Sequence, residues 1–431
     1  MEILTNILRG LLGISFLVGV LWLLSANKRS IPWKLVVAGI LFQIVFAILV
    51  LKVPFIQGAF EGLSNFFVKI LDFTRQGSIF LFGDLMDTKS YGFVFAFQIL
   101  PTIIFFSALT SLLFYFGILQ KVVYGLAWIM GKTMKVSGAE NLSTAANIFL
   151  GQTEAPLMIK HYLPTMTRSE ILCIMVGGMA NTAGGVLAAY VGFLGGDDPA
   201  QQLFFAKHLL AASVMSAPAT IVISKMLLPQ TEKIDEKIEI SREKLGTNFL
   251  EAIANGTTDG IRLAVNVAAM LLVFIALIAM LNYGMKDVLG KYTGLNEWVI
   301  TISGGRYDGF TMQFLLGYAC APISWVLGVC QHDMVYIGQL LGEKTILNEF
   351  VAYKSLGDMK TQMVFAEEKS MIMATYVLSG FANFSSIGIQ IGGIGALAPN
   401  KKGMLSELGI KALIGGTIAS LFTATIVGAM V

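Results

Sequence analysis

Long runs of apolar residues, separated by short polar connections, make up most of this chain. A run of about 20 apolar residues can cross the hydrocarbon core of a bilayer as an α-helix. Eight runs approach or exceed that length, and the pattern therefore predicts eight transmembrane helices. They cover approximately 4–26, 35–55, 92–117, 169–194, 205–228, 262–283, 371–394 and 408–431.

Two other apolar regions are interrupted by glycine, proline and acidic residues. We expect each to form a re-entrant helical hairpin, which enters and leaves the membrane on the same side, at roughly 140–166 and 310–356. Segments 57–74 and 118–134 mix apolar with polar residues, as amphipathic helices along a membrane surface do. The whole pattern predicts an all-α polytopic membrane protein.

The composition agrees with that pattern. Of the 431 residues, 55% are hydrophobic and 13% are charged, and the net charge is +3. A soluble domain carries about 25% charged residues. The small net charge gives no reason to expect a nucleic-acid partner. The three cysteines lie in apolar segments without metal-ligand spacing, and we interpret them as buried small side chains.

Basic residues are concentrated in connections that the predicted spans place on one side of the membrane. Examples are Lys28 and Arg29 after the first span, Lys401 and Lys402 before the last, and the charged stretch 231–244. Such residues favour the cytoplasmic side. We therefore expect both chain termini to lie outside.

The segment Asn147–Pro156 brings a carboxylate, two amides and a hydroxyl into an apolar region. An acid at membrane depth costs from about 3 to more than 10 kcal/mol, so Glu154 must be paired, hydrated or used. Gly151 and Pro156 flank it, which predicts a broken helix whose free backbone groups line a cavity or are buried in protein. We expect an unwound tip at a solute or ion site; a loop at the membrane surface is the alternative.

A short pattern recurs in the two halves of the chain. Gly178–Gly184 and Gly380–Ser386 both begin Gly-x-Ala-Asn and continue with small residues inside a predicted span. Each follows an interrupted hairpin that contains an acid, Glu154 in the first and Glu349 in the second. An odd number of crossings separates the copies, so they run in opposite senses. Inverted repeats with interrupted helices are typical of transporters whose binding site lies between the repeats.

Five motifs together resemble those of the concentrative nucleoside transporters. They occur in the order of that family and cover most of the chain after about residue 85. The resemblance implies eight spans plus two opposed hairpins, a homotrimer, and nucleoside uptake driven by a cation gradient across the inner membrane of a bacterium. The motifs are Gly151–Pro156, Gly177–Gly184, Asn255–Arg262, Leu347–Tyr353 and Gly380–Ser386.

The predicted spans and the resemblance divide the chain into four parts. Residues 1–134 would form N-terminal spans and interfacial helices of a scaffold, and 135–228 the first repeat with hairpin 1 and spans 4 and 5. Residues 229–309 would supply a cytoplasmic connection, an interfacial helix and span 6 as scaffold and trimer contact. Residues 310–431 would form the second repeat with hairpin 2 and spans 7 and 8.

The resemblance implies that the first hairpin binds the base of a nucleoside. Gln152 and Thr153 would hydrogen-bond the base, directly or through water, with Glu154 nearby. An amide offers both a donor and an acceptor, which the edge of a nucleobase requires. A structural pair with a lysine or a backbone N–H is the alternative for this acid and for its counterpart in the second hairpin.

The resemblance places the ribose at the second hairpin and the seventh span. Glu349, Asn383 and Ser386 would bind its hydroxyl groups, and a carboxylate that accepts from a diol forms strong hydrogen bonds. Phe381 and Val186 would supply apolar contact. Ordinary helix packing is the alternative for both Phe381 and Ser386.

A sodium site is implied between the first hairpin tip and the fourth span. Its ligands would be the side chains of Asn147 and Asn181 and the main-chain carbonyls of Leu150 and Thr182. Neutral oxygens suit a hard monovalent ion. Asn181 departs from the Ser or Thr expected there in the family. Proton coupling through a hairpin acid is the alternative, because an apolar site favours the neutral form of a carboxyl group. No organic cofactor is expected.

Two other classes of protein are weighed against a transporter. A membrane enzyme is disfavoured because His161, His208 and His332 are scattered, no His-Glu-x-x-His motif occurs, and the acids form no adjacent aspartyl pair. A channel would favour a ring of like residues around one pore axis over two opposed broken halves.

Overall fold

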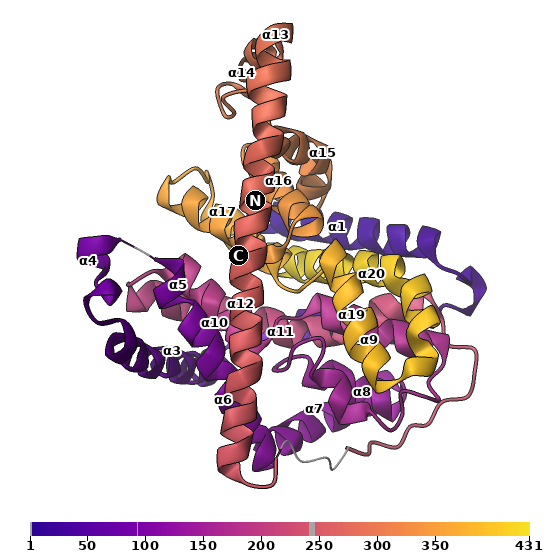
Figure 1. Ribbon diagram of the computed structural model, residues 1–431. Helices are drawn as coiled ribbons and strands as arrows, with labels where there is room; N and C mark the ends of the chain where they lie inside the picture. Colours follow the sequence, from indigo (N-terminus) through magenta and orange to yellow (C-terminus); the bar gives the residue numbers. More distant parts are fainter. Residues whose placement is uncertain (1, 93, 241–245) are drawn as a thin grey trace.

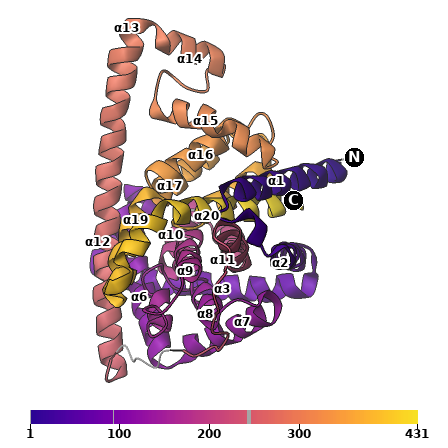
Figure 2. The ribbon, with the colours of Figure 1, turned by 90° about the vertical axis from the view of Figure 1, so that its right-hand side faces the viewer.

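The computed structural model describes residues 2–92, 94–240 and 246–431, and within these ranges every regular element is a helix. Figure 1 shows that α12 (Phe249–Asn282) runs the height of the molecule. In Figure 2 it forms one edge, and both chain termini lie at the opposite side. The last part of the charged stretch 231–244 lies outside the described residues.

The described α-helices, with the short 3-10 and π segments between them, follow in chain order. They are α1 (Glu2–Leu24), η1 (Lys28–Ser30), α2 (Trp33–Lys52), α3 (Pro54–Phe82), η2 (Gly83–Met86), α4 (Thr88–Tyr91), α5 (Phe95–Gln98), α6 (Leu100–Tyr115), α7 (Ile118–Met134), α8 (Gly138–Ala146), η3 (Ala155–Ile159), α9 (Arg168–Ala180), α10 (Gly184–Gly195), α11 (Pro199–Leu227), α12, η4 (Tyr283–Gly290), α13 (Lys291–Thr293), α14 (Leu295–Ser303), α15 (Met312–Val326), α16 (Met334–Ile346), α17 (Glu349–Thr361), α18 (Glu368–Leu378), α19 (Phe384–Leu397), η5 (Pro399–Lys401) and α20 (Lys402–Gly428).

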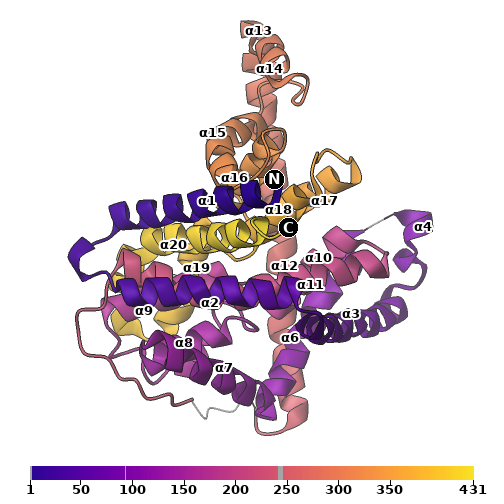
Figure 3. The ribbon, with the colours of Figure 1, turned by 180° about the vertical axis from the view of Figure 1, so that it is seen from behind.

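Seven helical stretches of the described residues are long and apolar enough to cross a membrane. They correspond to all the predicted spans except 371–394, which is divided between the shorter helices α18 and α19. The predicted surface helix 118–134 coincides with α7, whereas the one at 57–74 lies inside the longer α3. Figure 3 shows α1 beside α20, and α2 also contacts α20.

The second predicted hairpin has different bounds in the structure. The turn before Glu349 joins α16 to α17, so a helical hairpin around this acid covers 334–361. The predicted range 310–356 included α15, a separate helix that packs antiparallel to α16, and it stopped within α17. Both α15 and α16 are apolar and glycine-containing, so the pattern did not separate them.

The breaks of the two divided helices cross each other. Gly380, just after α18, has φ +92°, a conformation that costs glycine little. A Cβ atom there would lie 2.6 Å from the backbone carbonyl of Ala180, the last residue of α9. Only a glycine allows this approach, which brings Asn181 and Asn383 to the same level of the molecule.

Candidate functional site

A cavity of about 520 Å³ lies where the two hairpin tips meet the two helix breaks. One wall is formed by α12, with Asp259, Asn266 and Met270 among its residues. The other walls include all the residues for which the sequence predicts nucleoside contact. These are Gln152, Thr153, Glu154, Val186, Glu349, Phe381, Asn383 and Ser386.

A hydrogen bond between side chains joins the two halves across this cavity. The Nε2 of Gln152, at the first hairpin tip, donates to the Oγ of Ser386 in α19 (3.2 Å). The Oε1 atom of Gln152 is buried and has no protein partner among the described residues. Gln152 is therefore held in place with an acceptor still free, as recognition of a polar solute requires.

Asn383 connects α19 to the acid of the second hairpin. Its Oδ1 accepts from the backbone N–H of Ser386 (2.9 Å) and from the hydroxyl of Ser385 (2.7 Å), so it caps the N-terminus of α19. Its Nδ2 donates to Oε2 of Glu349 (2.7 Å). The cap fixes the amide, and the amide in turn orients the buried carboxylate.

The two acids have different surroundings. Glu349 is only 4% exposed, whereas Glu154 is exposed to the cavity. Glu154 also lines a neighbouring cavity of about 410 Å³, between α6 and α12, which contains Asp259 and Arg262. Within the described part of the chain neither acid forms an ion pair, and Lys344 acts on Glu349 electrostatically from beyond contact distance.

The residues for which the sequence predicts sodium coordination also lie together. Both polar atoms of the Asn147 side chain are buried without a partner among the described residues, and so is Nδ2 of Asn181. The Oδ1 of Asn181 accepts from the hydroxyl of Ser216. A Cβ added at Gly177 would lie 3.1 Å from Asn147 Nδ2 and 3.3 Å from Thr220, so these groups converge.

The two backbone positions of the predicted sodium site are buried at the same place. Leu150 is 4% and Thr182 1% exposed. Within the described residues, neither carbonyl accepts a backbone hydrogen bond. Burying polar groups without partners costs free energy. The cluster of neutral oxygens therefore fits a bound monovalent cation.

Helix α11 contributes residues that the sequence analysis did not identify. The buried hydroxyls of Ser213 and Thr220 have no partner among the described residues, and Ser216 contacts Asn181. Positions three and seven residues apart lie on one face of a helix. The spacing of 213, 216 and 220 was therefore a readable signal for a polar stripe facing the predicted ion site.

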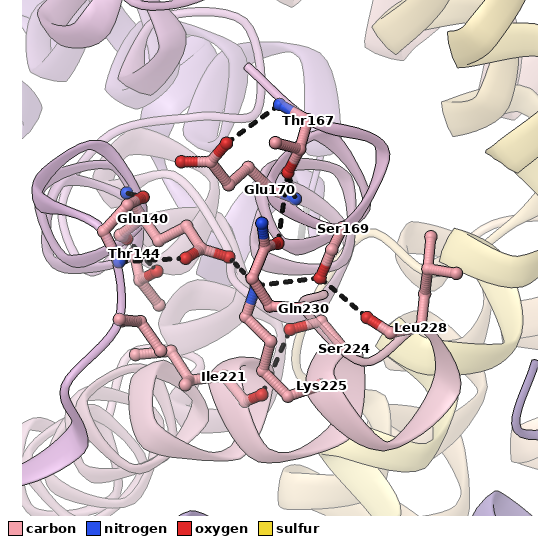
Figure 4. A network of polar contacts seen from close by, with 12 residues as sticks. Glu140, Thr144, Thr167, Ser169, Glu170, Ile221, Ser224, Lys225, Leu228 and Gln230 are labelled. Carbon is pink, nitrogen blue, oxygen red and sulfur yellow. Dashed lines mark hydrogen bonds and ion pairs between the residues drawn. The ribbon is translucent and has the colours of Figure 1, made fainter. Parts of the chain in front are cut away.

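A buried ion pair fastens the first hairpin to α11, away from the cavity (Figure 4). The Nζ of Lys225 lies 2.5 Å from Oε1 of Glu140 in α8 and donates to Ser169 (2.9 Å). The second carboxylate oxygen accepts from the backbone N–H of Ser137 (3.1 Å), which completes a capping box. The charges are thus paired and hydrogen-bonded where they are buried.

Models of known protein families match most of this chain. The family model "Na+ dependent nucleoside transporter C-terminus" matches residues 208–428, the corresponding N-terminus model matches 12–85, and a "Nucleoside recognition" model matches 96–197. An uncharacterized transporter of Haemophilus influenzae is 39% identical, with 98% of this chain and 97% of that protein covered. The nucleoside permease NupC of Helicobacter pylori is 36% identical, with 96% of each chain covered. The structure of CNTnw in an inward-facing substrate-bound state aligns with a TM-score of 0.88 at 33% identity, covering 98% of this chain and 97% of that one.

Proposed function

Because this chain belongs to the family of concentrative, Na+-dependent nucleoside transporters, we propose that it takes up nucleosides across the cytoplasmic membrane together with sodium. It is a multi-pass membrane transporter and not an enzyme. The single observation that carries the proposal is the shared cavity, where both hairpin acids meet amide and hydroxyl groups from two broken helices. Its mixture of donors, acceptors and apolar surface matches a nucleoside.

The proposed topology has eight spans and two opposed re-entrant hairpins in an inverted repeat. Residues 135–228 and 310–431 form the moving repeats, and 1–134 with 229–309 form the scaffold. Asn6 donates to the carbonyl of Val431 (3.4 Å), which supports an even number of crossings with both termini on one side. We place that side outside. Apolar side chains exposed along α12 supply surface for lipid or for the contacts of a homotrimer.

The proposed substrate lies between the two hairpin tips. Gln152 and Thr153 bind the base, with Glu154 close to it. The ribose hydroxyls bind to Glu349 and Asn383. The hydrogen bond between the two latter residues supports this assignment, since it aims a carboxylate at the cavity from a rigid helix end.

The remaining contacts are proposed from the same cavity. Ser386 assists at the ribose while it holds Gln152, and Phe381 and Val186 contact the apolar parts of the nucleoside. Alternating access then moves the hairpins and their partner helices against α12, because the site lies between the repeats and this scaffold helix.

The proposed sodium ion binds the side chains of Asn147 and Asn181 and the carbonyls of Leu150 and Thr182. The buried Oδ1 of Asn147, which has no partner among the described residues, supports the proposal. Asn181 supplies a carboxamide oxygen where the family pattern has a hydroxyl, and Ser216 orients it. Proton coupling is the second candidate, favoured by the exposure of Glu154 to the cavity without an ion pair.

Uptake of radiolabelled nucleosides by purified protein in vesicles tests the proposal. We expect accumulation under a sodium gradient, and counterflow of labelled nucleoside when the gradient is absent. Uptake that persists in choline and collapses with the pH gradient would assign the coupling to protons. Absence of both accumulation and counterflow for purine and pyrimidine nucleosides would refute nucleoside transport.

A further inference from the structure

The second half of the molecule buries a lysine that the proposed transport cycle has not used. Lys344 in α16 is 0% exposed. Its Nζ lies 2.9 Å from each of three oxygens, the carbonyls of Val377 and Ser379 and the hydroxyl of Ser420 in α20. Among the described residues it forms no ion pair, so uncharged oxygens make all its hydrogen bonds, and the carboxylate of Glu349 acts on it only from beyond contact distance.

The hydrogen bonds show which form of the amine fits. Backbone carbonyls can only accept. Ser420 donates its own hydrogen to the carbonyl of Thr417 (2.9 Å), so it too accepts from Lys344. The nitrogen must therefore donate three hydrogen bonds, which only a protonated ammonium group can do. The geometry describes a cation coordinated by three neutral oxygens.

This cation lies at the C-terminal end of α18, directly before the helix break. The last carbonyl groups of a helix lack intrahelical partners and carry partial negative charge. The Nζ of Lys344 occupies the position where these carbonyls meet α20. Three elements, α16, α18 and α20, are joined through one positive charge.

The first half has a matching arrangement without a lysine. Ser379 lies four residues before Asn383, and Gly177 lies four residues before Asn181. The side chains of Asn147 and Thr220 converge at Gly177. Lys344 precedes its hairpin acid by five residues, and Asn147 precedes its own by seven.

The third element corresponds as well. Ser420 in α20 follows Asn383 by 37 residues, whereas Ser216 and Thr220 in α11 follow Asn181 by 35 and 39. Hairpin, helix break and final helix of each half thus converge on one point. In the second half that point holds an ammonium group, and in the first it holds unpartnered neutral groups.

We propose that the ammonium group of Lys344 is a tethered monovalent cation, which takes in the second repeat the place that the coupling ion takes in the first. This inference rests on the proposed sodium site. The ammonium group occupies the cation position of the second repeat at every stage of the transport cycle. The hairpin and the broken helix of this repeat therefore stay joined. Only the first repeat then binds a free ion. Of the two cation positions, one takes a sodium ion when nucleoside binds, and Lys344 fills the other.

Exchanging the two arrangements tests the proposal. Asn147→Lys supplies a tethered cation to the first repeat, and Asn147→Met supplies a chain of similar length without charge. Lys344→Asn removes the tethered cation and leaves neutral ligands and space, with Lys354→Asn on the exposed face of α17 as its control. Binding of uridine or adenosine, whichever the unsubstituted protein binds, is measured in sodium and in choline.

We expect Asn147→Lys to bind nucleoside with affinities in sodium and choline that agree within about twofold, because its cation no longer dissociates. Asn147→Met should bind weakly in both. Lys344→Asn should lose about tenfold in affinity at the sodium concentration that saturates the parent. It should recover at higher sodium with a Hill coefficient of about 2, since two free ions are then needed.

Two results would overturn the inference. The first is that the Asn147→Lys protein still requires sodium to bind nucleoside, or binds nucleoside no better than the Asn147→Met protein. The other is a folded Lys344→Asn whose sodium dependence equals that of Lys354→Asn. Failure of the proposed sodium coupling is visible separately, because it appears in the unsubstituted protein as equal binding in sodium and choline.

Discussion

Among the described residues, each half of this transporter buries one lysine, and the two lysines have different surroundings. Lys225 in the first half faces the carboxylate of Glu140 at 2.5 Å, and together they form a neutral unit (Figure 4). Lys344 in the second half faces three uncharged oxygens. A pair can lose both charges with little cost, whereas a charge that is hydrogen-bonded only to neutral groups has no contacting partner to remove with it. We therefore assign a structural role to Lys225 and a role that depends on its positive charge to Lys344.

The two repeated asparagines differ in the same way. Asn383 uses its carbonyl oxygen to cap α19 and its amide to hold Glu349, so every part of it is engaged within the protein. Asn181 accepts one hydrogen bond from Ser216, does not cap α10, and keeps an unpartnered Nδ2. Asn383 is thus satisfied within the protein, whereas Asn181 keeps a buried polar atom without a partner among the described residues.

Lys225→Met tests the first side of the comparison and should have the largest effect. It leaves the carboxylate of Glu140 buried without its partner, which costs about 3–5 kcal/mol of stability. We expect a markedly lower midpoint of thermal unfolding in detergent. The double variant Glu140→Gln with Lys225→Met should recover most of the loss. A double variant as unstable as Lys225→Met alone would contradict the assignment of Lys225 to a neutral pair.

The residues that line the cavity could be selected from the sequence, whereas the buried polar residues around them could not. Acids and amides are conspicuous in apolar segments, so Glu154, Glu349 and Asn383 could be selected, and the structure brings them to one cavity. Their roles in binding remain predictions. Lys344 escaped notice because lysine normally marks a loop or a membrane surface, and only tertiary contacts show it buried. Ser216 escaped because a serine in a membrane helix is also an ordinary packing residue.

Glu349→Gln addresses the two acids and should have the next largest effect. Hydrogen bonds to a charged group contribute about 1.5–3 kcal/mol, so nucleoside affinity should fall by roughly tenfold to a hundredfold. The amide can still accept from Asn383, and the amount of folded protein should change little. Equilibrium binding in detergent measures the loss, with Glu297→Gln on the exposed face of α14 as control.

The same measurement on Glu154→Gln sharpens the contrast. Its carboxylate is exposed to the cavity, so water already competes for its hydrogen bonds and a smaller loss is expected. Equal affinity in Glu349→Gln and its parent would remove this acid from the ribose. A larger loss for Glu154→Gln than for Glu349→Gln would reverse the roles assigned to the two hairpins.

Asn147→Ala should have the smallest effect, on the sodium requirement alone. It removes one neutral ligand and leaves Asn181 and the carbonyls of Leu150 and Thr182, so the sodium concentration for half-maximal uptake should rise about threefold to tenfold. The exposed Asn400→Ala provides the control.

Stability distinguishes a ligand from a packing residue at this position. The amide of Asn147 has no partner among the described residues, so its removal takes an unsatisfied buried group out of the protein and should not lower the unfolding midpoint measured without sodium. Sodium should raise that midpoint in the parent, since an ion that binds only the folded state stabilises it, and should raise it less in Asn147→Ala. A variant that unfolds at lower temperature but keeps the full response to sodium would make Asn147 a structural residue. The first half would then lack the free-cation site that we propose sets it apart from the second.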